Sequence, residues 1–150
     1  MINRVSKMLV AVAGFLFYMQ AMAAETPANA QALVGKAVAF IKANGKDKAL
    51  VEFNNPKGAF VNGELYVFVL DKDGVTLANG VNPKIVGKSV MDMKDSTGKY
   101  FIKDLFAVAA SKGGGWVDYQ WPDPVSNKVR AKSTYVEKSG DWLVCAGIYK

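Results

Sequence analysis

Histidine is absent from this sequence, and cysteine occurs once, at Cys145. These two facts exclude Ser-His-Asp and Cys-His catalysis, zinc sites with histidine ligands, c-type haem attachment and a disulfide within the chain. Cys145 lies in the apolar run from Trp142 to Ile148, where a buried and unreactive thiol is expected. The sequence therefore predicts a binding protein, not an enzyme, with no catalytic residues, no metal and no cofactor.

Long runs of like charge are also missing. The chain carries 19 Lys and Arg against 13 Asp and Glu, and these residues are scattered along it. A mild excess of positive charge attracts anionic ligands or a negatively charged membrane surface. Without a cluster of basic residues it does not indicate a nucleic-acid-binding surface. We therefore expect a small anionic ligand and no nucleic-acid partner.

The first 23 residues have the three parts of a secretory signal peptide. Arg4 and Lys7 supply positive charge, Met8 to Met19 form an apolar run, and Ala21-Met22-Ala23 place small residues at the cleavage site. This segment is predicted to be a cleaved signal peptide, and residues 24–150 are predicted to be one periplasmic domain. The alternative is an uncleaved N-terminal anchor facing the periplasm, because the apolar stretch approaches the length of about 17 residues that can span a bilayer.

The domain is predicted to begin with helices. Thr26-Pro27 suits the start of a helix, because threonine can cap it and proline is tolerated in its first turn. Apolar residues then recur at helical spacing until Asn44-Gly45 ends the pattern. A shorter helical piece is expected around 46–53, before a loop rich in asparagine and glycine.

A β-hairpin follows the helices. Residues Glu64 to Leu70 alternate as a strand with apolar side chains on both faces, which predicts a sheet that is covered on both sides. Asp71-Lys-Asp-Gly74 supplies a tight turn into a partner strand at about 75–78. A calcium loop is not expected at this turn, because the other ligands of such a loop are missing.

The second half of the domain predicts a loop, a helix and three strands. Residues 79–97 form a loop-rich excursion, and a helix capped by Asp95, Ser96 or Thr97 follows and ends at Gly113-Gly-Gly115. Three strands are expected after it, at about 115–121, 129–137 and 141–149. This order predicts an α+β, PAS-like fold, with a long N-terminal helix on one face of a five-stranded antiparallel sheet and a second helix and loop-rich pocket cover on the other.

Several motifs occur in a recognisable order and spacing. They are Tyr66-Val-Phe-Val-Leu-Asp-Lys-Asp-Gly74, Gly87-Lys-Ser89, Asp95-Ser-Thr-Gly-Lys-Tyr-Phe101, Gly115-Trp-Val-Asp-Tyr-Gln-Trp-Pro122, Lys132-Ser-Thr-Tyr-Val136 and Gly147-Ile-Tyr149. In these motifs the chain resembles single Cache domains of the sCache_2 type over about residues 27–150. The element from Gly115 to Pro122 is the most specific of them.

This resemblance implies an extracytoplasmic sensor that binds a small organic acid or a similar metabolite. Such domains act in signal transduction or chemotaxis, so the implied partner is a membrane chemoreceptor or a sensor kinase. No signalling module follows in this sequence, which suggests a free-standing, exported member of the family. The family often has a His-Pro pair after the hairpin, whereas this chain has Ala78-Asn-Gly-Val-Asn-Pro83, so its ligand specificity is expected to differ.

The resemblance also implies the wall of the ligand pocket: Tyr66, Phe68, Trp116, Tyr119, Lys132 and Tyr135. Aromatic walls exclude water, and a buried ammonium gains most from a carboxylate partner, so Lys132 is the central candidate. Alternation along a strand places Trp116 opposite to Tyr119, and Lys132 opposite to Tyr135, so a twist or bulge is needed if all of them line one cavity. Trp121 and Trp142 are assigned to the core.

Two other functions fit the sequence. A periplasmic enzyme could use paired carboxylates, but no spacing of Asp118, Asp123 and Asp141 marks an acid and base pair. The second is an interaction subunit that docks on a receptor or kinase ectodomain without a ligand. A sealed or absent cavity behind Trp116 would favour that interpretation.

Overall fold

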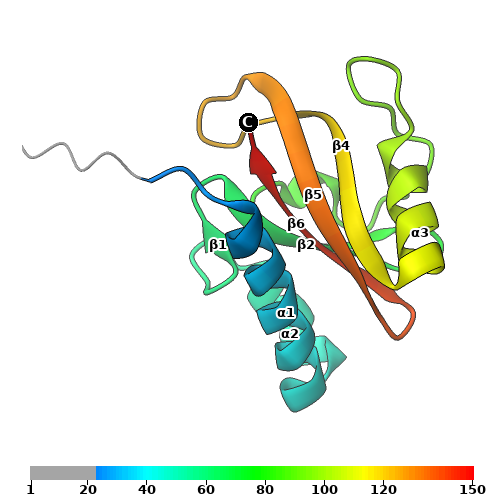
Figure 1. Cartoon of the computed structure of the whole chain (residues 1–150). Helices are drawn as coiled ribbons and strands as arrows, with labels where there is room; N and C mark the ends of the chain where they lie inside the picture. Colours follow the sequence, from blue (N-terminus) through cyan, green and yellow to red (C-terminus); the bar gives the residue numbers. More distant parts are fainter. Residues whose placement is uncertain (1–22) are drawn as a thin grey trace, which may run out of the picture.

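The computed structural model describes residues 23–150, and the predicted signal peptide lies outside the described residues apart from Ala23 (Figure 1). Within this range the chain folds as helices, a hairpin, a long loop, a third helix and a three-stranded meander. None of the helices in the described range combines the length and the apolar character that crossing a bilayer requires.

The two N-terminal helices form where the sequence predicts them. Helix α1 spans Pro27–Asn44, and the Oγ1 atom of Thr26 accepts a hydrogen bond from the backbone N–H of Asn29 at 3.3 Å. Gly45 has a φ of 84°, which a residue with a side chain rarely adopts, and it separates α1 from α2 at Lys46–Phe53. The predicted cap and stop signals are thus confirmed.

The strands form one antiparallel sheet. Its members are β1 (Val61–Asn62), β2 (Leu65–Leu70), β3 (Thr76–Asn79), β4 (Gly114–Pro122), β5 (Val129–Ser139) and β6 (Trp142–Tyr149). The order is β1-β2-β6-β5-β4, and β3 pairs with β2 as well. The prediction of five strands was one short, because Val61 and Asn62 pair with Tyr66 and Leu65 as a brief sixth strand.

Each face of the sheet is covered, as the apolar alternation of β2 predicted (Figure 1). Val67 and Val69 of β2 pack with α1 and α2 on one face. Tyr66 and Phe68 point to the other face, where α3 (Phe101–Lys112) and the residues before it complete a second core. We call residues 80–100, between β3 and α3, the cover segment; it includes a short 3-10 helix, η1, at Pro83–Ile85.

The start of α3 differs from the prediction. Its N-cap is Tyr100, without a side-chain capping bond, so none of Asp95, Ser96 and Thr97 caps the helix. The buried carboxylate of Asp95 instead accepts hydrogen bonds from the Thr97 hydroxyl and from the backbone N–H groups of Thr97, Lys99 and Gln120. These bonds hold the pKa of Asp95 well below its ordinary value, and the bonds from the Thr97 hydroxyl and from Gln120 contribute most to this shift. Asp95 thereby fastens the cover segment to β4.

The run Gly113-Gly-Gly115 is explained by packing. Gly113 ends α3 in the left-handed conformation with a φ of 73°. A Cβ atom on Gly114 would lie 2.9 Å from the carbonyl oxygen of Val136, and one on Gly115 would lie 2.6 Å from the Cγ1 atom of Val108. Close approach of β4 to its neighbours therefore requires glycine at these two positions.

Candidate functional site

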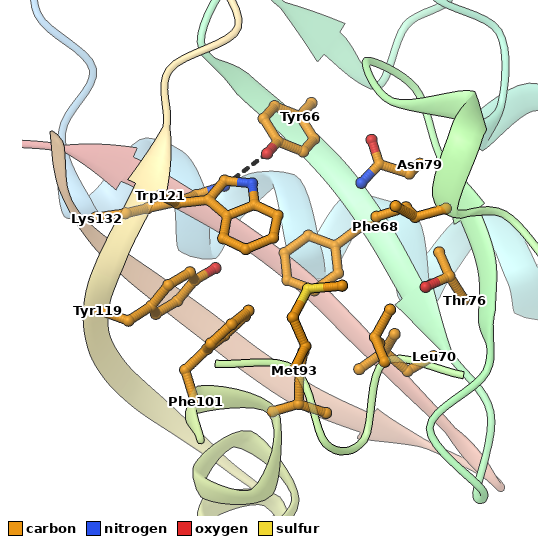
Figure 2. Close-up of a pocket in the computed structure, with 13 residues that line it drawn as sticks. Tyr66, Phe68, Leu70, Thr76, Asn79, Met93, Phe101, Tyr119, Trp121 and Lys132 are labelled. Atoms are coloured by element: carbon orange, nitrogen blue, oxygen red, sulfur yellow. Dashed lines mark hydrogen bonds between the residues drawn. The ribbon is translucent and has the colours of Figure 1, made fainter. Parts of the chain in front are cut away.

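A cavity lies between the sheet and the cover segment (Figure 2). Side chains from β2, β3, β4, β5, α3 and the cover segment converge on it. The lining residues are Tyr66, Phe68, Leu70, Thr76, Asn79, Ile85, Val90, Met93, Phe101, Ile102, Tyr119, Trp121 and Lys132. Most of the wall is apolar or aromatic, and a few polar groups are set into it, which is the usual composition of a small-molecule site.

Lys132 is the only cation that lines this cavity within residues 23–150, and it is 1% exposed. Its Nζ atom donates a hydrogen bond to the Tyr66 hydroxyl at 2.9 Å. The side chain crosses the neighbouring strand at Gly147, where a Cβ atom would lie 2.7 Å from the Cε atom of Lys132. The lysine can therefore reach β2 because β6 has a glycine at this point.

Aromatic rings surround the ammonium of Lys132. The Nζ atom lies 4.2 Å from the ring centroid of Tyr66, 5.0 Å from that of Tyr149 and 5.6 Å from that of Phe68. No carboxylate within residues 23–150 forms an ion pair with it. Since an ammonium has three donors and Tyr66 takes one, it retains the capacity to bind an anion.

The wall on β4 is built from stacked rings. Tyr119 stacks on Phe101 of α3 with 4.2 Å between centroids, and Trp121 lies 5.1 Å from the same ring. The Tyr119 hydroxyl shares a 2.9 Å hydrogen bond with the Thr134 hydroxyl. Burial raises the pKa of Tyr119 well above its ordinary value, so this side of the cavity stays neutral at physiological pH.

Two polar side chains of β3 lie on the opposite side of the cavity from Lys132 (Figure 2). Thr76 is 1% exposed, and its hydroxyl has no hydrogen-bond partner among the described residues. Asn79 is 4% exposed, and its Oδ1 atom accepts hydrogen bonds from the backbone N–H groups of Val81 and Asn82. The cavity is thus polar at two ends and apolar between them.

The cavity is nearly filled by its own side chains. The cavity volume that remains free is about 20 Å³, which is enough for about one water molecule. Ile85, Val90 and Met93 of the cover segment close it from above the sheet. A larger ligand must therefore displace part of this segment, and Met93 is the side chain best suited to move, because methionine is unbranched and flexible.

Four of the six predicted wall residues meet at this cavity: Tyr66, Phe68, Tyr119 and Lys132. The other two do not line it. Trp116 pairs with Tyr135 in an unbroken register between β4 and β5, and their rings lie 5.3 Å apart on the opposite face of the sheet. No bulge turns them inward, so the structure does not bring these two residues together with the other four.

The sequence did not indicate nine of the thirteen lining residues, among them Trp121, Thr76 and Asn79. Trp121 was assigned to the core, but it lines the cavity. Its spacing from Tyr119 was an available signal, because residues two apart on a strand share a face. Thr76 and Asn79 gave no such signal, since each resembles an ordinary hairpin residue until the cover segment is placed over it.

The carboxylates near the site have structural partners and none of them lines the cavity within residues 23–150. Asp123 is 2% exposed; burial raises its pKa, but hydrogen bonds from Val125, Ser126 and Arg130 outweigh this and lower it to about 2. Asp118 pairs with Lys150 at 3.2 Å. The described residues hold no group of three or more potential metal ligands.

Similar proteins include methyl-accepting chemotaxis proteins. The chain is 26% identical over 86 residues to the methyl-accepting chemotaxis protein McpP of Pseudomonas putida, a stretch that is 56% of this chain and 16% of that receptor. It also resembles the crystal structure of a methyl-accepting chemotaxis protein from Vibrio parahaemolyticus, with a TM-score of 0.68 and 26% identity over 81% of this chain and 86% of that one.

Two further solved structures have the same fold. One is a periplasmic sensor domain of a chemotaxis protein, with a TM-score of 0.65 and 24% identity over 79% of this chain and 86% of the other. The second is a Cache chemosensory domain whose structure explains carboxylic acid recognition by that domain. It has a TM-score of 0.63 and 24% identity over 79% of this chain and 84% of the other. Residues 17–150 match the family described as Single Cache domain 2, sCache_2, and the chain therefore belongs to that family.

Proposed function

We propose that this domain is an extracytoplasmic sensor that binds a small organic acid in the cavity beside Lys132. One observation carries the proposal: a buried ammonium faces an aromatic cavity, and no carboxylate of the described residues pairs with it. An unpaired buried charge is costly to a protein, and an anionic ligand would offset that cost. The relatives that are chemoreceptor domains support a sensory role.

Binding would use the groups already in place. A ligand carboxylate accepts hydrogen bonds from the Nζ atom of Lys132, and the Tyr66 hydroxyl can donate a further one. The rings of Phe68, Tyr119 and Trp121 exclude water, which strengthens this pairing because the local dielectric is low. No step of this binding breaks a covalent bond, in keeping with a sensor.

Signalling would follow from movement of the cover segment. Because the cavity holds about one water molecule, ligand entry requires Ile85, Val90 and Met93 to rearrange. A ligand that stabilises one arrangement of this segment shifts the population of the whole domain toward it. The partner that detects this change is proposed to be a membrane chemoreceptor or a sensor kinase.

A thermal-shift screen of short organic acids tests the proposal. Lys132→Met keeps the apolar stem and removes the charge, so stabilisation by acids should disappear while the melting temperature without ligand stays the same or rises. Lys138→Met, an exposed lysine on the same strand, is the matched control and should respond like the unmodified protein. An equal response of the Lys132 variant to every acid would refute the proposal.

The small cavity volume favours a second candidate function, docking on a receptor or kinase ectodomain without a ligand. In that case no acid in the screen would raise the melting temperature. The receptor or kinase ectodomain would bind equally well with and without added acid. The screen therefore separates the two candidates.

A further inference from the structure

The hydroxyl of Thr76 is a buried polar group without a partner. Its Oγ1 atom is inaccessible to solvent and makes no hydrogen bond within residues 23–150. Such a group is uncommon in folded proteins, and leaving it unpaired costs about 1–3 kcal/mol. Figure 2 shows its oxygen on the side that faces the other lining residues. A ligand atom that bonds to this hydroxyl would recover the cost.

The backbone around Thr76 is held in place. Its N–H donates to the carbonyl oxygen of Lys88 at 3.0 Å, and its carbonyl oxygen accepts from the N–H of Gly87 at 2.7 Å. The N–H of Val90 also donates to the carbonyl oxygen of Gly74 at 2.8 Å. Thr76 therefore lies where β3 and the cover segment are joined, and its side chain is presented by a fixed backbone.

Asn79 adds a donor near the same end of the cavity. Because its Oδ1 atom accepts from Val81 at 3.1 Å and from Asn82 at 2.9 Å, the amide nitrogen is turned the other way, toward Phe68 in Figure 2. That nitrogen makes none of the hydrogen bonds found between described residues, so its two N–H groups are available. Thr76 and Asn79 together can serve an acceptor oxygen of a ligand.

The strand register sets how far this pair lies from the positive charge. Asn79 pairs with Phe68, and Thr76 pairs with Leu70, four residues beyond the Tyr66 that holds Lys132. Four residues of strand, from Tyr66 to the partner of Thr76, span about 13 Å, and two residues, from Tyr66 to the partner of Asn79, span about 7 Å. One ligand can reach both Lys132 and Thr76 only if it is elongated. The side chains of these two residues project toward each other's end of the cavity, so the ligand itself has to span a shorter distance.

From this arrangement we infer that the cavity selects an elongated acid, of about four to six carbons given the strand spacing, with an oxygen at the end remote from its carboxylate. The carboxylate binds Lys132, and the remote oxygen binds Thr76 and Asn79. That oxygen belongs to a hydroxyl or carbonyl group, because no second cation lines the cavity within the described part of the chain. The inference rests on the proposed function and specifies its ligand.

A matched pair of acids tests the inference. Pentanoate and 5-hydroxypentanoate have the same length and charge, and differ in the remote oxygen. Titration calorimetry should give an affinity about 5- to 10-fold higher for the hydroxy acid, because about one additional hydrogen bond contributes a difference of this size. Thr76→Val should reduce this ratio to about 1, and Thr76→Ser, which keeps the hydroxyl, should preserve it.

The outcomes are distinct. Binding of both acids with equal affinity, or a ratio that Thr76→Val leaves unchanged, overturns the inference and leaves the proposed function standing. Failure of both acids to bind overturns the inference, and it overturns the proposed function as well if the short acids of the thermal-shift screen also fail to bind. Thr76→Val should also leave the melting temperature without ligand unchanged or raised, because it removes an unpaired hydroxyl. A large loss of that stability would show that a bound water already serves the hydroxyl and would overturn the inference as well.

Discussion

The ammonium of Lys132 donates a 2.9 Å hydrogen bond to the phenol oxygen of Tyr66, which lies 66 positions earlier in the sequence. This bond joins β5 to β2 across the intervening strand β6. It fixes the charge of the cavity in one position before any ligand binds. Such preorganisation reduces the entropic cost of binding, so a single lysine can serve as the main anchor of a small anion.

Gly147 should be essential to this geometry. An alanine Cβ there would lie 2.4 Å from the Thr134 hydroxyl oxygen and 2.7 Å from the Cε atom of Lys132. Gly147→Ala is therefore expected to destabilise the fold by about 1–3 kcal/mol and to displace the lysine. Chemical denaturation measures the first effect, and acid titration of the folded variant measures the second.

A matched glycine provides the control. Gly35 lies within α1, where a Cβ atom would meet nothing within 4 Å. Gly35→Ala should stabilise the protein by about 0.5–1 kcal/mol and leave acid binding unchanged. If Gly147→Ala behaved in the same way, the proposed path of Lys132 across β6 would be wrong.

Asp123 should make the fold sensitive to acid. Its folded-state pKa of about 2 lies below the ordinary value of about 3.9, so the carboxylate favours folding at neutral pH. That contribution is present above pH 4 and is lost as the pH falls from about 4 to about 2. Asp123→Asn should therefore be less stable at pH 7 and should show a flatter loss of stability in this window, as measured by urea unfolding at several pH values.

Asp73 is the comparison for this experiment. Its side chain is 66% exposed and pairs with the exposed Lys72. Asp73→Asn should follow the acid profile of the unmodified protein. An Asp123→Asn profile that also matched it would mean that the bonds from Arg130 and Val125 do not hold the carboxylate as described.

The two tryptophans of β4 should differ in their effect on ligand binding. Trp121 lines the cavity, whereas Trp116 lies on the opposite face and is 36% exposed. Trp121→Ala is expected to weaken acid binding about tenfold or more, because it removes a ring that excludes water. Trp116→Ala should change the affinity by less than about twofold. The reverse order in calorimetry would place the ligand on the other face of the sheet.

Cys145 should be unreactive in the native protein. It is 0% exposed, and burial raises its pKa well above the ordinary value, so almost no thiolate forms at neutral pH. A thiol reagent should label it only after unfolding. Rapid labelling of the folded protein would instead reveal frequent opening of the core beneath Phe68, its partner across the β2–β6 pair.

Local signals in the sequence predicted most of the fold. Thr26-Pro27 and Gly45 act through bonds and dihedral angles within a few residues, so the ends of α1 could be predicted correctly. Asp95 was misassigned as a helix cap because its strongest partners include Gln120, 25 positions away. No short-range pattern records a contact of that kind, and only the packing of the cover segment on β4 reveals it.

The site was predictable where strand alternation applied. Alternation correctly separated Trp116 from Tyr119, and the regular pairing of β4 with β5 left no bulge to bring them together. The same alternation places Trp121 on the same face of β4 as Tyr119. The unpartnered hydroxyl of Thr76 could not be predicted, because its environment depends on the cover segment and on side chains from three strands.

The most direct test of the account compares an anion with a neutral molecule of the same shape. Titration calorimetry with propanoate and propanamide isolates the role of the charge, because the two differ little in size. Propanoate should bind about 100-fold more tightly than propanamide, a difference of about 2.7 kcal/mol, and Lys132→Met should remove the difference. Equal affinities, or a preference that survives in the Lys132→Met variant, would contradict it.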